Sequence, residues 1–246
     1  MSSSQTYKMA SLFSGIGGLE LGIEAAVPGL RTCWQVEQDE FCRRVLAKHW
    51  PDAKRYTDVR TVKPEDIRDA DVLCGGFPCQ DISLAGSGSG LAGDKSALWW
   101  EMYRLISVAL PRVVVAENVP ALTGRGLSDV LCSLARSGYT CEWDTISAAA
   151  VGGHHIRRRI FIVAYRNAAN PVRKGLQGQR EVTERASTKF AHFSSSTWRE
   201  TAPKLCSTSD GVPRRVARIR ALGNAVVPQV AYQVGLKVAQ VLNVPV

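Results

Sequence analysis

The chain has 246 residues, of which 45% are hydrophobic and 22% are charged, and its formal net charge is +9. This length supplies one sizeable hydrophobic core, the composition excludes a disordered chain, and no apolar run approaches the ~20 residues of a membrane span. The seven cysteines form no Cys-x-x-Cys pair and the N-terminus shows no secretory signal, so we expect reduced thiols and a cytoplasmic location.

The positive charge is concentrated in one part of the chain. Residues 155–220 contain 15 Lys and Arg against 4 Asp and Glu, a balance of +11, whereas residues 1–154 contain 15 against 18. A nearly neutral body with a strongly basic segment indicates a polyanionic partner. The alternative is a solvated loop that its charge keeps in solution, and charge alone does not separate the two.

Predicted strands and helices alternate up to about residue 165. Apolar and β-branched runs predict strands over 8–13, 31–37, 71–76, 112–119, 139–151 and 159–165, with a further short strand just before Asp58. Apolar residues spaced by three and four predict helices over 17–27, 39–50, 95–110 and 126–137. The alternation indicates an α/β fold with a doubly wound, mostly parallel sheet, in which ligands bind beyond the carboxyl ends of the strands.

After Arg166 this periodicity disappears. Residues 166–210 are rich in Ser, Thr, Arg, Gln and Gly, which predicts a small irregular lobe or a mobile loop. A final amphipathic helix is predicted over 226–242. We therefore divide the chain into residues 1–165, residues 166–210 and residues 211–246.

A glycine-rich turn, SLFSGIGGLELG over residues 11–22, joins the first strand to the first helix. Glycines let the backbone approach a ligand closely, and a helix N-terminus favours negative charge, which suits a nucleotide-like cofactor. No Gly-Lys-Ser/Thr follows, so the turn does not match a Walker phosphate loop. An ordinary tight strand–helix turn is the alternative interpretation.

Acidic residues follow the next two strands. Glu37 lies about twenty residues after the glycines, where an acid accepts hydrogen bonds from ribose hydroxyls. Asp58 follows the short third strand and is a candidate for binding an adenine amino group. Each acid alone is typical of a surface charge, but their positions at successive strand ends favour binding.

Cys79 lies in the loop GGFPCQ, directly after the fourth strand. A loop cysteine beside backbone amides is a candidate thiolate nucleophile, whereas a structural cysteine belongs on the apolar run, as Cys74 does. The spacing of these two cysteines does not match a zinc site, and we expect no metal.

Two further motifs carry ionisable side chains. Glu117 follows the apolar strand RVVVA, where burial would raise its pKa enough for it to donate a proton. In HHIRRRIF, Arg157 and Arg159 lie on the same side of an extended segment and could hold an anion, although an arginine triplet is usually solvated. Near the C-terminus, the Gly-Asn of GNAVVP is predicted to open the last helix, with plain helix capping as the alternative.

In this order the motifs resemble those of the cytosine-5 DNA methyltransferase family. The matching stretches are SLFSGIGG, the acid of QVEQDEF, the aspartate of YTDVR, GGFPCQ, ENV, the RxR of HHIRRRIF, and GNAVVP. They span residues 9–165 and 211–240. The resemblance, which composition and periodicity do not reach, implies a small phage- or bacterial-type methyltransferase with a Rossmann-like fold that methylates a cytosine flipped out of double-stranded DNA.

The resemblance also implies catalytic roles. Cys79 attacks C6 of the cytosine, Glu117 hydrogen-bonds N3 and the exocyclic amine, and Arg157 and Arg159 position the base and the active-site loop. C5 then takes the methyl group of S-adenosylmethionine, a base removes the C5 proton, and the cysteine leaves. Glycines through Gly93 give the active-site loop freedom to close.

Binding residues are implied in the same way. The S-adenosylmethionine site is expected to comprise Phe13, Ser14, Gly15, Gly17, Gly18, Leu19, Glu37, Gln38, Asp58, Val59, Gly76, Pro78, Asn224, Ala225 and Val226. The DNA-binding residues are expected to include Gln80, Ser83, Arg214, Arg215 and Arg218. Residues 1–165 then form the catalytic and cofactor-binding core, residues 166–210 a reduced target-recognition segment, and residues 211–246 a part that returns to the core.

The chain departs from the family pattern at several places. His154 and His155 stand where the family often has Pro-Gln, Ser11 stands where it often has Asp, and about 45 residues serve as the recognition segment. Two alternatives stay open: an RNA (tRNA) cytosine-5 methyltransferase, whose catalytic core would look the same, and a catalytically silent DNA-binding relative, which the short segment leaves open. A monomer is expected, with a cognate restriction endonuclease as a candidate partner and no membrane.

Overall fold

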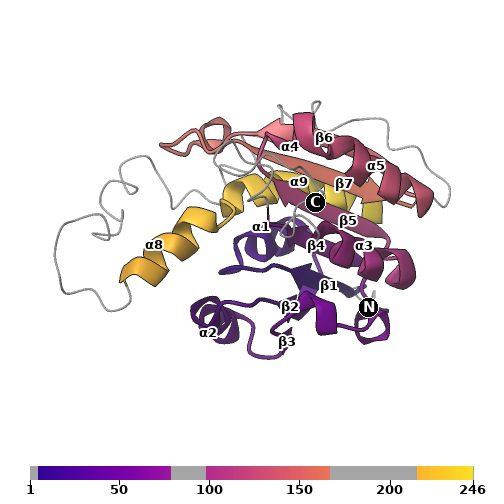
Figure 1. Cartoon of the computed structure of the whole chain (residues 1–246), viewed down its shortest axis with the longest axis horizontal. Coiled ribbons are helices and arrows are strands. Elements are labelled where there is room, and N and C mark those ends of the chain that lie inside the picture. The colour runs from indigo at the N-terminus through magenta and orange to yellow at the C-terminus, as the bar shows by residue number, and fades with distance from the viewer. Residues whose placement is uncertain (1–4, 79–97, 167–214, 246) are drawn as a thin grey trace.

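The computed structural model describes residues 5–78, 98–166 and 215–245. These residues form one mixed sheet of seven strands in the order β3-β2-β1-β4-β5-β7-β6, covered by helices (Figure 1). The strands are β1 (Tyr7–Leu12), β2 (Leu30–Val36), β3 (Lys54–Tyr56), β4 (Val72–Gly76), β5 (Val113–Asn118), β6 (Thr140–Ile146) and β7 (Arg159–Tyr165). The helices are α1 (Gly18–Ala26), α2 (Glu40–His49), α3 (Leu98–Ala109), α4 (Leu122–Arg125), α5 (Leu127–Arg136), α8 (Arg215–Asn224) and α9 (Pro228–Leu242).

The sheet is parallel from β3 through β5 and antiparallel at one side. β5 pairs antiparallel with β7, and β7 pairs antiparallel with β6. Because β2, β1, β4 and β5 all run in the same direction, their carboxyl ends meet at one edge of the sheet. The predicted α/β class with a mostly parallel sheet is therefore confirmed.

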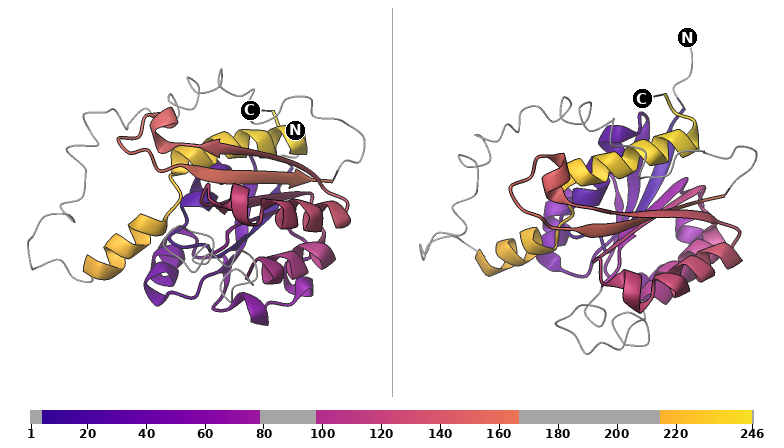
Figure 2. Two further views of the ribbon diagram at one scale, coloured as in Figure 1. Left: turned by 45° about the horizontal axis from the view of Figure 1, so that its top comes forward. Right: turned by 90° about the horizontal axis from the view of Figure 1, so that it is seen from above.

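Two hydrophobic clusters lie on opposite faces of the sheet. In β5, Val114 and Ala116 join the cluster under α3 and α5, whereas Val113 and Val115 join the cluster under α1 and α9. This alternation is the two-residue period of a strand that is buried on both faces. Figure 2 shows α9 along one face of the sheet and α3 with α5 along the other.

Helices α1 and α9 pack closely because small residues face each other. A Cβ atom added at Gly22 would overlap Ala231, and one added at Gly235 would lie 2.6 Å from the Cβ atom of Ala26. The backbones of α1 and α9 therefore lie close together, although α1 is near the start of the chain and α9 is near its end. Residues of α9 thus pack onto the core that residues 7–165 begin.

Several predicted boundaries differ from the observed ones. The strand predicted over 139–151 ends at Ile146, and a short 3-10 helix, η4 (Ala148–Val151), follows, with Ser147 accepting a hydrogen bond from the Ala150 amide. The Gly-Asn pair does not open the last helix: Asn224 ends α8, and Pro228 opens α9. Helix α8 itself was not predicted, because its basic residues interrupt the apolar spacing.

The predicted recognition segment, 166–210, lies outside the described residues except for Arg166, whose amide donates to the carbonyl of Arg112. The glycine-rich loop through Gly93 also lies outside them. Among the helices of the described ranges, none combines the length and apolar character that a membrane span requires.

Candidate active site

A cavity of about 760 Å³ opens at the carboxyl edge of the parallel strands. Its walls come from the ends of β1, β2, β4 and β5, from the start of α1 and α2, and from α8 with the residues that follow it. The sequence-predicted residues that line it are Phe13, Ser14, Gly15, Gly18, Leu19, Glu37, Gln38, Gly76, Pro78, Glu117, Arg159, Asn224, Ala225 and Val226. Residues from both ends of the chain therefore meet in one cavity, of a size typical of small-molecule sites.

The β1–α1 turn is shaped by positive φ angles. Phe13 has φ 56°, Gly15 has φ 56° and Gly17 has φ 88°, in the left-handed region where glycine carries no steric penalty. The Ser14 amide donates to the Val36 carbonyl at 3.1 Å, which ties the turn to the end of β2. A Cβ atom added at Gly15 would meet no atom within 4 Å, so the backbone there faces open space.

Glu37 connects this turn to the N-terminus of α2. Its two carboxylate oxygens accept hydrogen bonds from the Gly15 and Asp39 amides, each at 2.7 Å. The Asp39 side chain in turn caps α2 by accepting from the Cys42 amide at 3.0 Å. Both acids line the cavity, and the remaining lone pairs of Glu37 can accept further hydrogen bonds from a ligand.

Glu117 and Arg159 form an ion pair in the same cavity. Oε1 of Glu117 lies 3.0 Å from Nε of Arg159, because β5 and β7 are antiparallel neighbours whose ends bring these side chains together. Burial raises the pKa of Glu117 to about 7, against the lowering effect of Arg159 and Arg157. The carboxyl group can therefore hold a proton near neutral pH while an arginine keeps it oriented.

The chain just before Cys79 is held against β5. Asn118 donates through Nδ2 to the carbonyl of Phe77 at 3.1 Å, and the Phe77 ring is buried against Trp99. Pro78, the last described residue before Cys79, lines the cavity. Cys79, Gln80, Ser83 and Arg214 lie outside the described residues, so their assigned roles stay predictions.

Arg157 lies outside the cavity lining and contacts the end of α8. Its Nη1 donates to the carbonyl of Gly223 at 2.6 Å, and its own φ of 26° is positive. Burial lowers the pKa of its guanidinium, with a smaller contribution from Arg159. Nε and Nη2 are buried and find no hydrogen-bond partner among the described residues. Arg157 thus connects the segment before β7 to the α8–α9 junction.

Three of the residues predicted to bind the cofactor do not line the cavity. Gly17 faces Trp50, and a Cβ atom there would overlap the indole ring. Asp58 caps the short 3-10 helix η1 (Val59–Thr61) and pairs with Arg60, whose Nη2 lies 2.7 Å from Oδ2. Val59 is buried in the cluster under α3. Of the predicted DNA-binding residues within the described ranges, Arg215 begins α8 and Arg218 is exposed on it.

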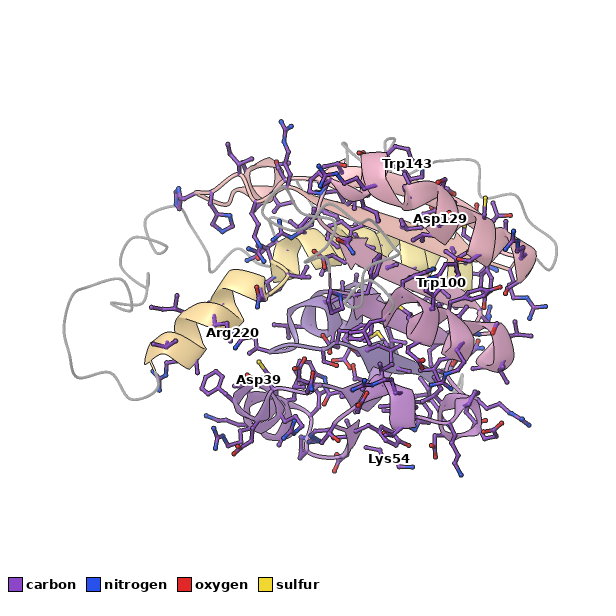
Figure 3. The ribbon with its side chains drawn as sticks, viewed as in Figure 1. Asp39, Lys54, Trp100, Asp129, Trp143 and Arg220 are labelled. Carbon is purple, nitrogen blue, oxygen red and sulfur yellow. The ribbon has the colours of Figure 1, made fainter. Side chains whose placement is uncertain are left out.

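Other cavity residues were missed by sequence reasoning. The additional lining residues are Ser11, Leu12, Glu20, Asp39, Glu40, Cys42, Phe77, Leu98, Asn118, Val119, Ala217, Arg220 and Ala221. Figure 3 shows Arg220 on α8 and Asp39 at the start of α2 on facing sides of this region. A signal for Glu20 was available in LELG, because this acid directly follows the apolar Leu19 and lies three positions before the apolar Ile23.

Within the described ranges, no group of three or more His, Cys, Asp and Glu side chains is arranged to hold a metal ion. The arrangement instead combines a glycine turn open to a ligand, an acid at the end of β2, and a proton-holding carboxyl group paired with an arginine. It suits a nucleoside-type ligand placed next to a polar reacting group.

Comparisons with known proteins agree with this arrangement. The Type II methyltransferase M.NgoBI of Neisseria gonorrhoeae is 34% identical over 163 residues, which cover 65% of this chain and 50% of that protein. M.Sau3AI of Staphylococcus aureus is 34% identical over 182 residues, which cover 66% of this chain and 44% of that protein. The chain thus spans about half the length of these curated relatives.

The fold is also that of solved methyltransferases. The structure of the S. pombe Dnmt2 methyltransferase matches with a TM-score of 0.66 at 14% identity, over 96% of this chain and 98% of that one. The family model for C-5 cytosine-specific DNA methylases matches residues 7–207, well over half of the chain. The chain therefore belongs to the C-5 cytosine-specific DNA methylase family.

Proposed function

We propose that the protein transfers a methyl group from S-adenosylmethionine to C5 of a cytosine in double-stranded DNA. The observation that carries this proposal is a single cavity in which the β1–α1 glycine turn and the Glu117–Arg159 pair face the same space. A methyl donor and its acceptor must be adjacent for direct transfer. Membership of the family supports the choice of acceptor.

The cavity fits S-adenosylmethionine. Gly15 leaves the backbone open to a ligand, and Glu37 offers carboxylate oxygens at the place where ribose hydroxyls are bound in related sheets. Gly18 lies so close to the Val226 carbonyl that a side chain would overlap it, which brings residues 224–226 over the turn. When bound, the cofactor supplies an electrophilic methyl group on a sulfonium.

Side chains of the protein activate the target cytosine for methyl transfer. We propose that the Cys79 thiolate bonds to C6 of cytosine while protonated Glu117 donates to N3, so that electron density moves toward C5. Arg159 holds the Glu117 carboxyl group in place through the 3.0 Å contact in which its Nε donates to Oε1, and this contact does not require Glu117 to be charged. Loss of the methyl group to C5 would leave S-adenosylhomocysteine as a neutral thioether. The N3 proton then returns to Glu117, the C5 proton leaves to a base and the C6–S bond breaks, which restores the aromatic ring and the thiolate.

DNA is proposed to lie over the cavity mouth and along α8. Arg218 is exposed on this helix and Arg220 lines the cavity, so a phosphate backbone beside the mouth would meet positive charge. Residues 166–210 are proposed to contribute target recognition. A cognate restriction endonuclease is the proposed functional partner, because the relatives are Type II methyltransferases. We propose that the protein acts as a monomer in the cytoplasm.

The test is methyl transfer from labelled S-adenosylmethionine to duplex DNA and, in parallel, to structured RNA, with products digested to nucleosides and separated. Label in 5-methyldeoxycytidine is the expected result. Label only in 5-methylcytidine would show that the substrate is RNA rather than DNA. No label in either product, with measurable binding of the cofactor, would leave a DNA-binding relative without catalysis.

The nucleophile has its own prediction. Cys79→Ser should abolish transfer but leave the affinity for S-adenosylhomocysteine unchanged, because the thiol acts on the base rather than on the cofactor. Cys74→Ser is a suitable comparison, since Cys74 lies fully buried on β4. Full methylation by the Cys79→Ser variant would contradict the covalent mechanism.

A further inference from the structure

Glu20 is a fully buried acid in the wall of the cavity. It lies in the first turn of α1, its exposed fraction is 0%, and it belongs to the cavity lining. Its Oε1 accepts a hydrogen bond from the Ser11 hydroxyl at 2.6 Å. The Ser14 hydroxyl lies 3.0 Å from that of Ser11, so two serines support one face of the carboxyl group.

The other oxygen, Oε2, has no hydrogen-bond partner among the described residues. An unpartnered oxygen on a buried acid is costly, and buried charges are usually paired. The described surroundings supply no such cation: Lys237 on the adjacent α9 is paired with Glu142 at 2.7 Å. The partner that the carboxylate lacks can therefore come from a ligand in the cavity.

The missing partner must be a hydrogen-bond donor, and a positive charge would add to the attraction. An ammonium group has three N–H donors, whereas a sulfonium has none. A sulfonium must also face the methyl acceptor, on the side of the cavity where Glu117 and Arg159 lie. Oε2 of Glu20 therefore matches the primary ammonium group of the proposed cofactor rather than its sulfonium.

We propose that Glu20 binds the amino group of S-adenosylmethionine, held in position by the hydroxyls of Ser11 and Ser14. This inference rests on the proposed function, and it adds a binding residue that the sequence motifs did not indicate. It also places the amino-acid end of the cofactor at the start of α1.

One consequence is that cofactor binding is linked to a proton. Burial raises the pKa of Glu20 to about 7, the hydroxyls of Ser11 and Ser14 act in the opposite direction, and the charge of Glu24 raises it slightly. Cys74, on the neighbouring β4, is kept as a neutral thiol because burial raises its pKa well above the ordinary value. At a pH below 7 the carboxyl group is mostly protonated, and an arriving ammonium would displace that proton.

The experiment compares two ligands by isothermal titration calorimetry at pH 6.5. S-adenosylhomocysteine has no sulfonium, so its amino group is its only cation, and its deamino analogue has none. We expect wild type to bind S-adenosylhomocysteine at least about tenfold more tightly than the analogue, because the analogue lacks the charge-assisted hydrogen bond that the ammonium group makes. Titration in two buffers of different ionisation enthalpy should show proton release with S-adenosylhomocysteine and none with the analogue.

Glu20→Gln should reduce the preference for the amino ligand about tenfold and abolish the proton release. Glu24→Gln is the matched control, because Glu24 lies one turn along α1 outside the cavity lining, with its oxygens accepting from Thr32 and Trp50. This control should keep both the preference and the proton release. If Glu20→Gln does not fold, Glu20→Asp takes its place, because the shorter side chain keeps the carboxylate but withdraws it from the ligand and should also reduce the preference.

Equal affinity of wild type for the two ligands, or an unchanged preference in Glu20→Gln, would overturn the assignment of Glu20. Binding of neither ligand by wild type would instead overturn the proposed cofactor. The two failures are therefore distinguishable.

Discussion

Glu117 depends on its immediate neighbours for both its protonation and its position. Burial favours the neutral acid, and the ion pair with Arg159 favours the charged form, so that the pKa lies at about 7. Position is set by a glycine, because Gly76 at the end of β4 leaves room for the carboxyl group across the β4–β5 pair. The pKa and the position of Glu117 thus depend on its burial, on Arg159 and on Gly76, and no single sequence motif contains all three.

Gly76→Ala should reduce methyl transfer about a hundredfold, since a Cβ atom there would lie 2.6 Å from Oε2 of Glu117. The overlapping atom is the end of a flexible side chain, so the carboxyl group shifts and the fold survives. Gly124→Ala is the control, because a Cβ atom at Gly124 meets no atom within 4 Å. Single-turnover rates together with circular dichroism check the prediction, and a fully active Gly76→Ala would contradict the placement of Glu117.

Glu20 should reduce the stability of the ligand-free protein as the pH rises. Its pKa in the fold is about 7 against an ordinary value of 4.5, so the unfolded chain releases the proton first. The stabilisation is complete below pH 4.5 and is lost as the pH rises through 7. The rise of the Glu20 pKa from 4.5 to about 7 corresponds to about 3 kcal/mol of unfolding free energy.

Wild type should therefore lose about 3 kcal/mol of unfolding free energy relative to Glu20→Gln between pH 4.5 and pH 8. Urea denaturation at several pH values measures this difference. Parallel stability curves for the two proteins would show that Glu20 does not change its charge in this range. Glu24→Gln serves again as the control.

At the scale of elements, α1 and α9 act as one unit. Their contact depends on Gly22 and Gly235, where side chains would overlap the facing helix. Residues 224–226 precede α9 and line the cavity, and Gly18 in the first turn of α1 abuts Val226. The packing of two helices distant in sequence thus positions one wall of the site.

Gly22→Ala should destabilise the fold by about 1–3 kcal/mol, which is the range for an overfilled core. The better helix propensity of alanine offsets at most about 1 kcal/mol of this cost. Gly124→Ala has the same propensity gain without an overlap, so it should not destabilise. Urea denaturation of both variants measures the difference, and a stable Gly22→Ala would mean that the α1–α9 contact is looser than described.

Helix α8 shows how an element can be missed. Its exposed Val216, Ile219 and Leu222 lie among arginines, so no apolar face marks it as a core helix. It is held at its end by Arg157, whose Nη1 bonds to the Gly223 carbonyl. Arg157 of the HHIRRRIF motif therefore supports the helix that forms one wall of the cavity.

At the scale of the whole molecule, the charge is divided between a neutral body and a basic segment. The two hydrophobic clusters of the described residues are built from residues up to 165 and from 226 onward. The excess of 11 positive charges lies in residues 155–220, which share only β7 (Arg159–Tyr165) with the clusters. The hydrophobic core and the proposed attraction to DNA therefore depend on largely different stretches of the chain.

DNA affinity should fall steeply with salt, with a log–log slope of roughly −0.9 for each phosphate neutralised. Deleting residues 173–204 removes Lys and Arg in excess of Asp and Glu, so the slope should become shallower while the core still unfolds cooperatively. Fluorescence anisotropy at several salt concentrations gives both slopes, with S-adenosylhomocysteine affinity as a control for the core. A flat dependence in the full chain would contradict a phosphate-binding role.

The sequence by itself determined the α/β class, most of the elements and the family, because strand and helix periods and ordered motifs such as GGFPCQ and ENV are local properties. It also placed Glu37 and Glu117 at strand ends, where the structure finds them in one cavity. The roles of Cys79 and of the 166–210 segment remain sequence predictions, since Cys79 and residues 167–210 lie outside the described residues.

Only the tertiary structure decided which residues share the cavity. It brings in Glu20 and Arg220, and it leaves Asp58 with Arg60 and Gly17 against Trp50. The reason is that burial and proximity depend on contacts between segments far apart in sequence, such as α1 with α9 and Arg157 with Gly223. A motif specifies which chemical groups are present, whereas packing decides which of them meet and which of them keep a proton.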